Sequence, residues 1–336
     1  MKKKRVTFGL LGLMVCAIAL YVQLHNKDNI PVKTSAIHPE EDRIFFIYSN
    51  PLIKESVLLT TSTGERFNRR MFKVADVPYI QTKSVASTDI VLLAEHEPFY
   101  YTLEKDVIKE HLLSDPFAFW YEGEDVSVKA YNVDTAGNEI HINDRKTKKE
   151  YQLTLPSLVT MGASDENYIY IIQGMSIYVI DRKTEEIIET LGLASYADKF
   201  ADSEEFIVAS SQHELTVIEK GTWKTTYIPY PDELEYADTV YYDKESGTFY
   251  VTYEDKEGEA NLLEYGKDFS FHTYGLKFPY MDAKFKGNQL YIVAQEEHKK
   301  GIGGYVGVFD IRSKKKLYQF DLPEEQVKEQ DFVVVD

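Results

Sequence analysis

Residues 168–184 read YIYIIQGMSIYVIDRKT, two runs of β-branched and aromatic residues separated by a Gly-Met pair. Short runs of this composition, bounded by glycine and polar residues, are typical of β-strands. A further β-rich run lies on either side, at Ser157–Ser164 and Ile187–Leu191, and the polar residues 182–185 fit a hairpin turn. The stretch therefore predicts one antiparallel unit of four strands.

The same kind of run recurs along the whole chain after residue 43. The seven copies begin 36 to 46 residues apart, about 41 on average, at Ile44–Tyr48, Ile90–Leu93, Val126–Ala130, Tyr168–Ile172, Phe206–Ala209, Phe249–Tyr253 and Leu290–Ala294. A period of this length with four short strands per unit is the signature of a propeller blade. Helical repeats would need long stretches of 3.6-residue periodicity instead. The sequence therefore predicts an all-β fold, a seven-bladed β-propeller.

The segment Ser176–Thr184 resembles the YVTN-type and quinoprotein-like β-propeller repeats of bacterial exported proteins, and Tyr305–Asp310 resembles them more weakly. The resemblance extends over most of residues 43–335 as architecture. It departs from the quinone-binding pattern, because no unit ends in Thr-Gly-x-x-x-Trp and the chain has only Trp120 and Trp223. The resemblance therefore implies a propeller fold and a cell-envelope location, and no quinone cofactor.

The ring of blades must close, since an open ring leaves two exposed strand edges. The residues before Ile44 make a poor strand, whereas the chain ends in an extra strand-like run, Asp331–Val335. We therefore expect this tail to supply the innermost strand of the first unit, which would complete seven blades.

The first thirty residues differ in composition from the remainder. The cations Lys2–Arg5 precede 19 uncharged residues, Val6–Leu24, enough for a helix that crosses a bilayer. The positive-inside rule places residues 1–5 in the cytoplasm, 6–24 in the membrane as a signal-anchor, 25–42 as a stalk and 43–336 outside the cytoplasm as the propeller. Cleavage after Ala17-Ile18-Ala19, or lipidation at Cys16, are the alternatives, and the unbroken apolar run argues against both.

Charge and cysteine content exclude several functions. The 336 residues carry a formal net charge of −17, and only one of the 55 acids lies in the first thirty residues. Such an acidic ectodomain argues against nucleic acid as a partner. The single cysteine, Cys16, excludes a disulfide framework and a cysteine nucleophile outside the membrane. Neither a zinc-type His spacing nor a serine-nucleophile motif occurs.

A second periodic signature marks where each innermost strand begins. It consists of an aromatic residue or leucine followed two residues later by a variable one, at Tyr79/Gln81, Phe117/Phe119, Leu158/Thr160, Tyr196/Asp198, Tyr236/Asp238 and Tyr280/Asp282. We expect the first residue to pack between blades and the third to lie near the axis. Asp198, Asp238 and Asp282, together with Gln81, are therefore the candidate binding residues at the mouth of the central channel.

Two interpretations of these carboxylates remain open. They bond backbone amides at turns, as aspartates commonly do, or they hold a hard cation such as Ca²⁺ through oxygen ligands. The turn interpretation is the more common arrangement, and no other cofactor is indicated.

Two functions follow from these features. The one we favour is a non-enzymatic, membrane-tethered binding or scaffolding module whose partner is a cell-envelope or membrane protein. The alternative is an envelope hydrolase or lyase acting on a glycan or peptide, with channel-mouth carboxylates as acid and base.

Overall fold

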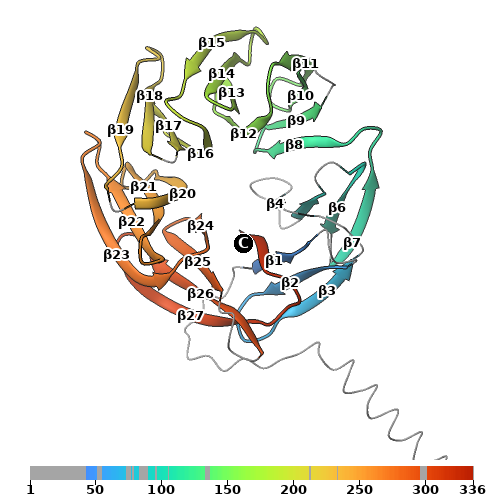
Figure 1. Cartoon of the computed structure of the whole chain (residues 1–336). Helices are drawn as coiled ribbons and strands as arrows, with labels where there is room; N and C mark the ends of the chain where they lie inside the picture. Colours follow the sequence, from blue (N-terminus) through green and yellow to red (C-terminus); the bar gives the residue numbers. More distant parts are fainter. Residues whose placement is uncertain are drawn as a thin grey trace, which may run out of the picture.

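The computed structural model describes residues 43–50, 55–72, 77, 79–82, 90–94, 97–104, 106–132, 137–211, 213–232, 234–295 and 301–335. In this part of the chain, seven antiparallel sheets of four strands surround a common axis (Figure 1). The sequence prediction of a seven-bladed, all-β propeller is confirmed. The predicted membrane segment 6–24 and the stalk 25–42 lie outside the described residues.

The blades are numbered in the order in which they follow one another along the chain. Within each blade the strands are given from the innermost to the outermost. Blade 1 contains β28 (Glu329–Val335), β1 (Arg43–Tyr48), β2 (Ser56–Thr61) and β3 (Asn68–Phe72). Blade 2 contains β4 (Tyr79–Thr82), β5 (Ile90–Leu93), β6 (Phe99–Glu104) and β7 (Val107–Leu112). Blade 3 contains β8 (Phe117–Glu122), β9 (Val126–Asn132), β10 (Asn138–Asp144) and β11 (Lys149–Leu155). Blade 4 contains β12 (Val159–Ser164), β13 (Tyr168–Gln173), β14 (Ser176–Asp181) and β15 (Ile187–Gly192).

The three remaining blades follow the same plan. Blade 5 contains β16 (Ala197–Asp202), β17 (Phe206–Ser211), β18 (Glu214–Glu219) and β19 (Thr225–Pro229). Blade 6 contains β20 (Leu234–Asp243), β21 (Thr248–Asp255), β22 (Glu259–Tyr265) and β23 (Phe271–Pro279). Blade 7 contains β24 (Asp282–Lys286), β25 (Gln289–Gln295), β26 (Ile302–Asp310) and β27 (Lys315–Pro323).

The C-terminal strand closes the ring, as expected from the sequence. β28 pairs antiparallel with β1, with Phe45 opposite Val333 and Arg43 opposite Val335. Phe332 is fully buried and its ring stacks on that of Phe46 at a centroid separation of 5.7 Å. The two ends of the propeller are thus held together in one sheet by backbone hydrogen bonds and aromatic packing.

The hydrophobic core is divided among the contacts between neighbouring blades. Each of the seven contacts has its own cluster of buried side chains. Six clusters contain ten or more buried hydrophobic residues, whereas the described residues between blades 2 and 3 contribute four: Val91, Leu93, Phe117 and Trp120. Among the described residues, the contact between blades 2 and 3 therefore has the smallest apolar cluster.

Because successive strands are antiparallel, the ring has two distinct rims. We call the side where innermost strands begin the acidic rim, after Asp238, Asp282 and Asp331, and the side where they end the arginine rim, after Arg182 and Arg312. Arg43, the first described residue, begins β1 and lies on the arginine rim. The chain therefore reaches the propeller on the side opposite the acidic carboxylates.

Buried ion pairs join blades along the arginine rim. Arg182, 3% exposed, makes two hydrogen bonds to the fully buried carboxylate of Asp144 in blade 3, at 2.7 and 2.6 Å. Burial opposes ionisation of Asp144, but hydrogen bonds from Arg182 and Thr147 and the charge of Arg182 lower its pKa to about 2. Arg312 of blade 7 also makes two hydrogen bonds to a buried carboxylate, Asp243 of blade 6, but its own side chain is 40% exposed.

Substituting Phe332 with alanine tests the closure. Loss of a fully buried aromatic side chain in the closing strand is expected to lower the free energy of unfolding by about 3–5 kcal/mol. Chemical denaturation followed by circular dichroism measures this change. Gln330→Ala is the matched control, because Gln330 is exposed on the same strand and its loss should change stability by less than about 0.5 kcal/mol. Equal stability of the two variants would contradict the assigned closure.

Substituting Arg182 with glutamine tests the arginine rim. The variant leaves the Asp144 carboxylate buried without its partner, which is expected to cost about 3–5 kcal/mol. The neighbouring Lys183→Gln removes an equal charge from an exposed position and should be nearly neutral. The wild-type pair also predicts acid sensitivity: because the folded-state pKa of Asp144 is depressed, its contribution is present above about pH 4 and lost as the pH falls toward 2.

Candidate functional site

The predicted site residues lie on four innermost strands at the acidic rim. Gln81 is in β4, Asp198 in β16, Asp238 in β20, and Asp282 at the start of β24. The side chain of Asp198 lies outside the described part of the structure. Of the others, Asp238 and Asp282 are close enough for the charge of Asp238 to raise the pKa of Asp282. The structure therefore brings at least two of the predicted carboxylates together at the channel mouth.

Asp238 is bound by side chains from the blades on either side of it. It is 7% exposed, and the phenol of Tyr280, which precedes blade 7, donates a hydrogen bond to its Oδ2. Lys199 Nζ of blade 5 lies 3.8 Å from its Oδ1. Asp238 thus connects blades 5, 6 and 7, which is a structural role for a residue that the sequence analysis named as a candidate binding residue.

Asp331 is a further carboxylate of the cluster, and the sequence analysis did not identify it as a site residue. Its Oδ2 accepts a hydrogen bond of 3.0 Å from the Ile80 amide of blade 2, and its Oδ1 accepts one of 2.9 Å from the Phe332 amide. Lys284 Nζ lies 2.8 Å from Asp331 Oδ1. Glu329 stands two residues before Asp331, where the periodic signature has an aromatic residue or leucine, so the signature does not include Asp331. The signal available in the sequence was its place at the start of the run Asp331–Val335, which was expected to close the ring.

Lys284 is the central cation of the cluster. Lys284 lies on β24, its side chain is 39% exposed, and its ammonium pairs with Asp331 of blade 1. Burial opposes its charge, yet the carboxylates of Asp331 and Asp282 hold its pKa above the ordinary lysine value. The cation that carboxylates gathered at one site require is thus supplied here by the chain itself.

Two acids of the cluster have raised pKa values. Burial, together with the negative charges of Asp331 and Asp238, raises the pKa of Asp282 to about 6 despite the opposing charge of Lys284. Burial also raises the pKa of Glu329 well above its ordinary value, and neither carboxyl oxygen of Glu329 has a hydrogen-bond partner in the described structure. Burial of Glu329 therefore favours its uncharged form.

Two expectations about these residues can be compared with the geometry. Asp282 Oδ1 accepts a hydrogen bond of 2.7 Å from the Ala283 amide, as the turn interpretation expects. Among the described residues, no group of three or more His, Cys, Asp or Glu side chains is placed to hold a metal ion. The Nε2 of Gln81 is buried without a partner in this part of the chain.

The expectation that the first residue of each signature packs between blades is correct only in part. Phe117 is buried, and Tyr280 bonds between blades. Tyr79, Leu158 and Tyr196 are instead 53%, 58% and 56% exposed. These three residues precede or begin innermost strands, so they lie on the acidic rim with more than half of each residue exposed.

Comparison with known proteins places the chain in a family. The fold and the carboxylates at the channel mouth place this chain in the class of seven-bladed β-propellers with an acidic channel mouth. An uncharacterized protein of Bacillus subtilis (strain 168), YeeG, is 86% identical over 338 aligned residues, which cover all of this chain and 99% of the relative. The chain therefore belongs to the YeeG family. No established family profile matches the sequence.

Solved structures of similar shape share little sequence with this chain. Dihydro-heme d1 dehydrogenase NirN aligns with a TM-score of 0.55 at 10% identity over 89% of this chain and 68% of NirN. Kluyveromyces lactis Hsv2 with loop 6CD replaced by a Gly-Ser linker aligns with a TM-score of 0.53 at 11% identity, over 74% and 82% of the two chains. At such identities the likeness shows the propeller fold alone.

The raised pKa of Asp282 predicts a change in how stability depends on pH. A folded-state pKa above the unfolded value of about 3.9 means that the contribution of Asp282 to stability is full below about pH 4 and is lost as the pH rises through about 6. Asp282→Asn stays neutral, so its thermal midpoint should rise relative to wild type as the pH increases from 4 to 7.

Differential scanning calorimetry at several pH values measures this difference. The control is Asp232→Asn, because Asp232 is exposed outside the cluster and its substitution should leave the pH dependence of wild type unchanged. A constant difference between Asp282→Asn and wild type over the whole pH range would show that Asp282 titrates normally.

Proposed function

We propose that this protein is a membrane-anchored, extracytoplasmic propeller that binds a protein of the cell envelope through its acidic rim. The observation that supports this most directly is the set of exposed apolar side chains on that rim, Tyr79, Leu158 and Tyr196, joined by Met175 in the turn between β13 and β14. Exposed apolar groups beside polar ones are typical of protein-binding surfaces.

The path of the chain supports the same orientation. Arg43 enters blade 1 on the arginine rim, so a tether formed by residues 6–42 would hold that rim toward the membrane. The acidic rim would then face away from the bilayer. This arrangement agrees with the envelope location that the resemblance to YVTN-type repeats implies. No helix in the described parts of residues 43–335 has the length and apolar character needed to cross a bilayer.

Charge defines the chemistry of the partner. The acidic rim carries Asp238, Asp282 and Asp331 around its axis, only partly balanced by Lys199 and Lys284. A partner surface that combines basic and apolar residues would complement it. We therefore expect the partner to be a protein with such a surface, and the binding to weaken as ionic strength increases.

An envelope hydrolase or lyase is the second candidate function. The pKa of Asp282, about 6, is the observation that favours it, since a general acid needs a pKa near the working pH. The bonds of Asp238 to Tyr280 and of Asp331 to Ile80 and Lys284 favour the binding function instead, because these carboxylates are engaged in holding blades together.

Membrane topology is tested with a single introduced cysteine. Because Cys16 is the one cysteine of the chain, Glu204→Cys in a Cys16→Ser background places a single thiol on the propeller, in the exposed turn after β16. A membrane-impermeant maleimide is expected to label it in intact cells from which the outer layers have been removed. Labelling only after the cells are broken would contradict the proposed orientation.

Binding at the acidic rim is tested by site-specific photo-cross-linking in intact cells. A benzophenone amino acid at Tyr196 is expected to cross-link one protein reproducibly, and the same group at Phe271 should not, because Phe271 begins the outer strand β23 on the arginine rim. Leu158→Asp should abolish the adduct formed from position 196. Identical adducts from both positions would contradict binding through the acidic rim.

A further inference from the structure

Blade 3 carries polar side chains along one face of its second strand, β9. Along β9 the residues alternate, with Val126, Val128 and Ala130 packed toward blade 4 and Ser127, Lys129 and Tyr131 on the opposite side. The second strand of a propeller blade is normally buried on both faces between neighbouring blades, as are Ile169 and Tyr170 of β13. Alternation in such a strand therefore indicates that one face borders water.

A cleft lies over this polar face. Its volume is about 600 Å³, which is within the range of roughly 300–1,000 Å³ found for small-molecule sites. The face belongs to the seam with blade 2, because Tyr131 and Trp120 pack there with Tyr100 of β6. The cleft therefore lies beside the smallest of the seven apolar clusters found among the described residues.

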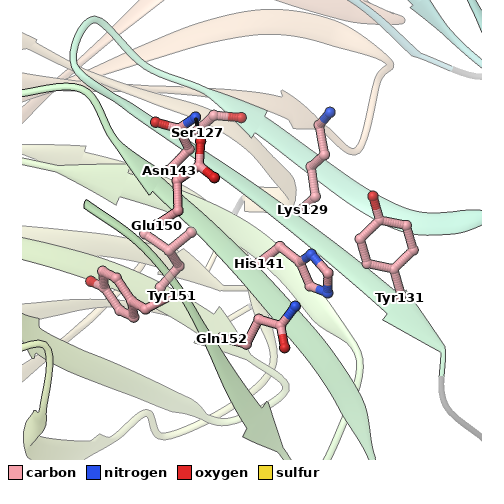
Figure 2. Close-up of a pocket in the computed structure, with 9 residues that line it drawn as sticks. Ser127, Lys129, Tyr131, His141, Asn143, Glu150, Tyr151 and Gln152 are labelled. Atoms are coloured by element: carbon pink, nitrogen blue, oxygen red, sulfur yellow. Dashed lines mark hydrogen bonds between the residues drawn. The ribbon is translucent and has the colours of Figure 1, made fainter. Parts of the chain in front are cut away.

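The polar side chains form a grid across three adjacent strands (Figure 2). Lys129 of β9 lies opposite His141 of β10, and His141 lies opposite Gln152 of β11. Two residues further along β10, Asn143 donates a hydrogen bond of 2.9 Å to Glu150 Oε1. Hydrogen-bond donors and acceptors are therefore mixed over one face of the sheet.

Several of these groups make no hydrogen bond within the described structure. This is the case for the ammonium of Lys129, the hydroxyl of Tyr131 and the side-chain amide of Gln152. Lys129 Nζ lies 4.0 Å from the centre of the Trp120 ring, and burial lowers the pKa of Lys129. The cleft thus offers donors and an acceptor that are available to a ligand.

The mixture of donor and acceptor side chains in the cleft favours some classes of ligand over others. An apolar ligand would leave the amide, ammonium and carboxylate groups without partners. A strongly anionic ligand would meet Lys129 but also the carboxylate of Glu150, and the carboxylate of Glu139 lies beside His141. A hydroxyl group both donates and accepts, so a row of hydroxyls matches a mixed grid, and the ring of Tyr131 at one end offers an apolar face to a sugar ring.

We propose that the cleft on blade 3 is a binding site for a neutral carbohydrate, with Lys129, Asn143, Glu150 and Gln152 bonding its hydroxyls and Tyr131 packing against a ring. The site lies between blades 2 and 3, away from the acidic mouth of the channel, and does not depend on the partner proposed above.

Isothermal titration calorimetry on the full-length protein tests the proposal, in a detergent that has no sugar headgroup. The probes are maltotetraose, cellotetraose and chitotetraose, with tetragalacturonate and inorganic phosphate as anionic comparisons. At least one neutral tetrasaccharide is expected to bind with a Kd of about 1 mM or tighter. Gln152→Ala and Lys129→Met should each weaken that binding by about tenfold or more.

The control variants carry the same substitutions elsewhere. Gln330→Ala and Lys224→Met change exposed residues outside the cleft and should leave the Kd unchanged. Gln152 is exposed, so its variant is expected to fold, and its thermal midpoint confirms this. Absence of binding by all three neutral sugars, preference for tetragalacturonate or phosphate, or binding that is insensitive to both cleft variants would each overturn the proposal.

Discussion

The pairing of β28 with β1 is the interaction on which the rest of the structure depends. A propeller has no central core that holds all its blades at once, because its apolar residues are divided among contacts between neighbours. Without a closing strand the first blade would lack its innermost strand, and the ring would end in two exposed edges. Because the two ends of the propeller share one sheet, opening the ring requires breaking backbone pairing and the Phe46–Phe332 stack together.

Closure also determines the chemistry of the channel mouth. β28 carries Glu329 and Asp331 to the axis, where Asp331 meets Lys284 of blade 7 and the Ile80 amide of blade 2. The carboxylates gathered at the acidic rim are therefore joined from blade to blade by hydrogen bonds and by lysines of the chain itself. The charge of this rim and the closure of the ring are parts of one arrangement, so a variant that disturbs one is expected to affect the other.

Much of the fold was predictable because blade strands repeat with a simple period. The seven β-rich runs marked the blades, and the leftover run Asp331–Val335 marked the closure. The third position of the second signature brought Asp238 and Asp282 to one rim. Lys284 was not predictable as their counter-ion, because the partner of a side chain depends on how the blades pack. The exposure of Tyr79 and Tyr196 was not predictable either, because the repeat does not encode how each innermost strand begins. The cleft had a readable signal in Val126–Tyr131, where polar residues alternate in a strand that both neighbours would otherwise cover.

The closed ring is tested most directly by hydrogen exchange of the full-length protein, followed by mass spectrometry of peptides that cover β1 and β28. The account predicts that backbone amides of residues 43–48 and 329–335 exchange slowly and at similar rates, since each strand supplies the hydrogen-bond partners of the other. Rapid exchange of residues 329–335, while strands of blades 4 to 6 stay protected, would show that the C-terminal strand is not part of the ring and would contradict the account.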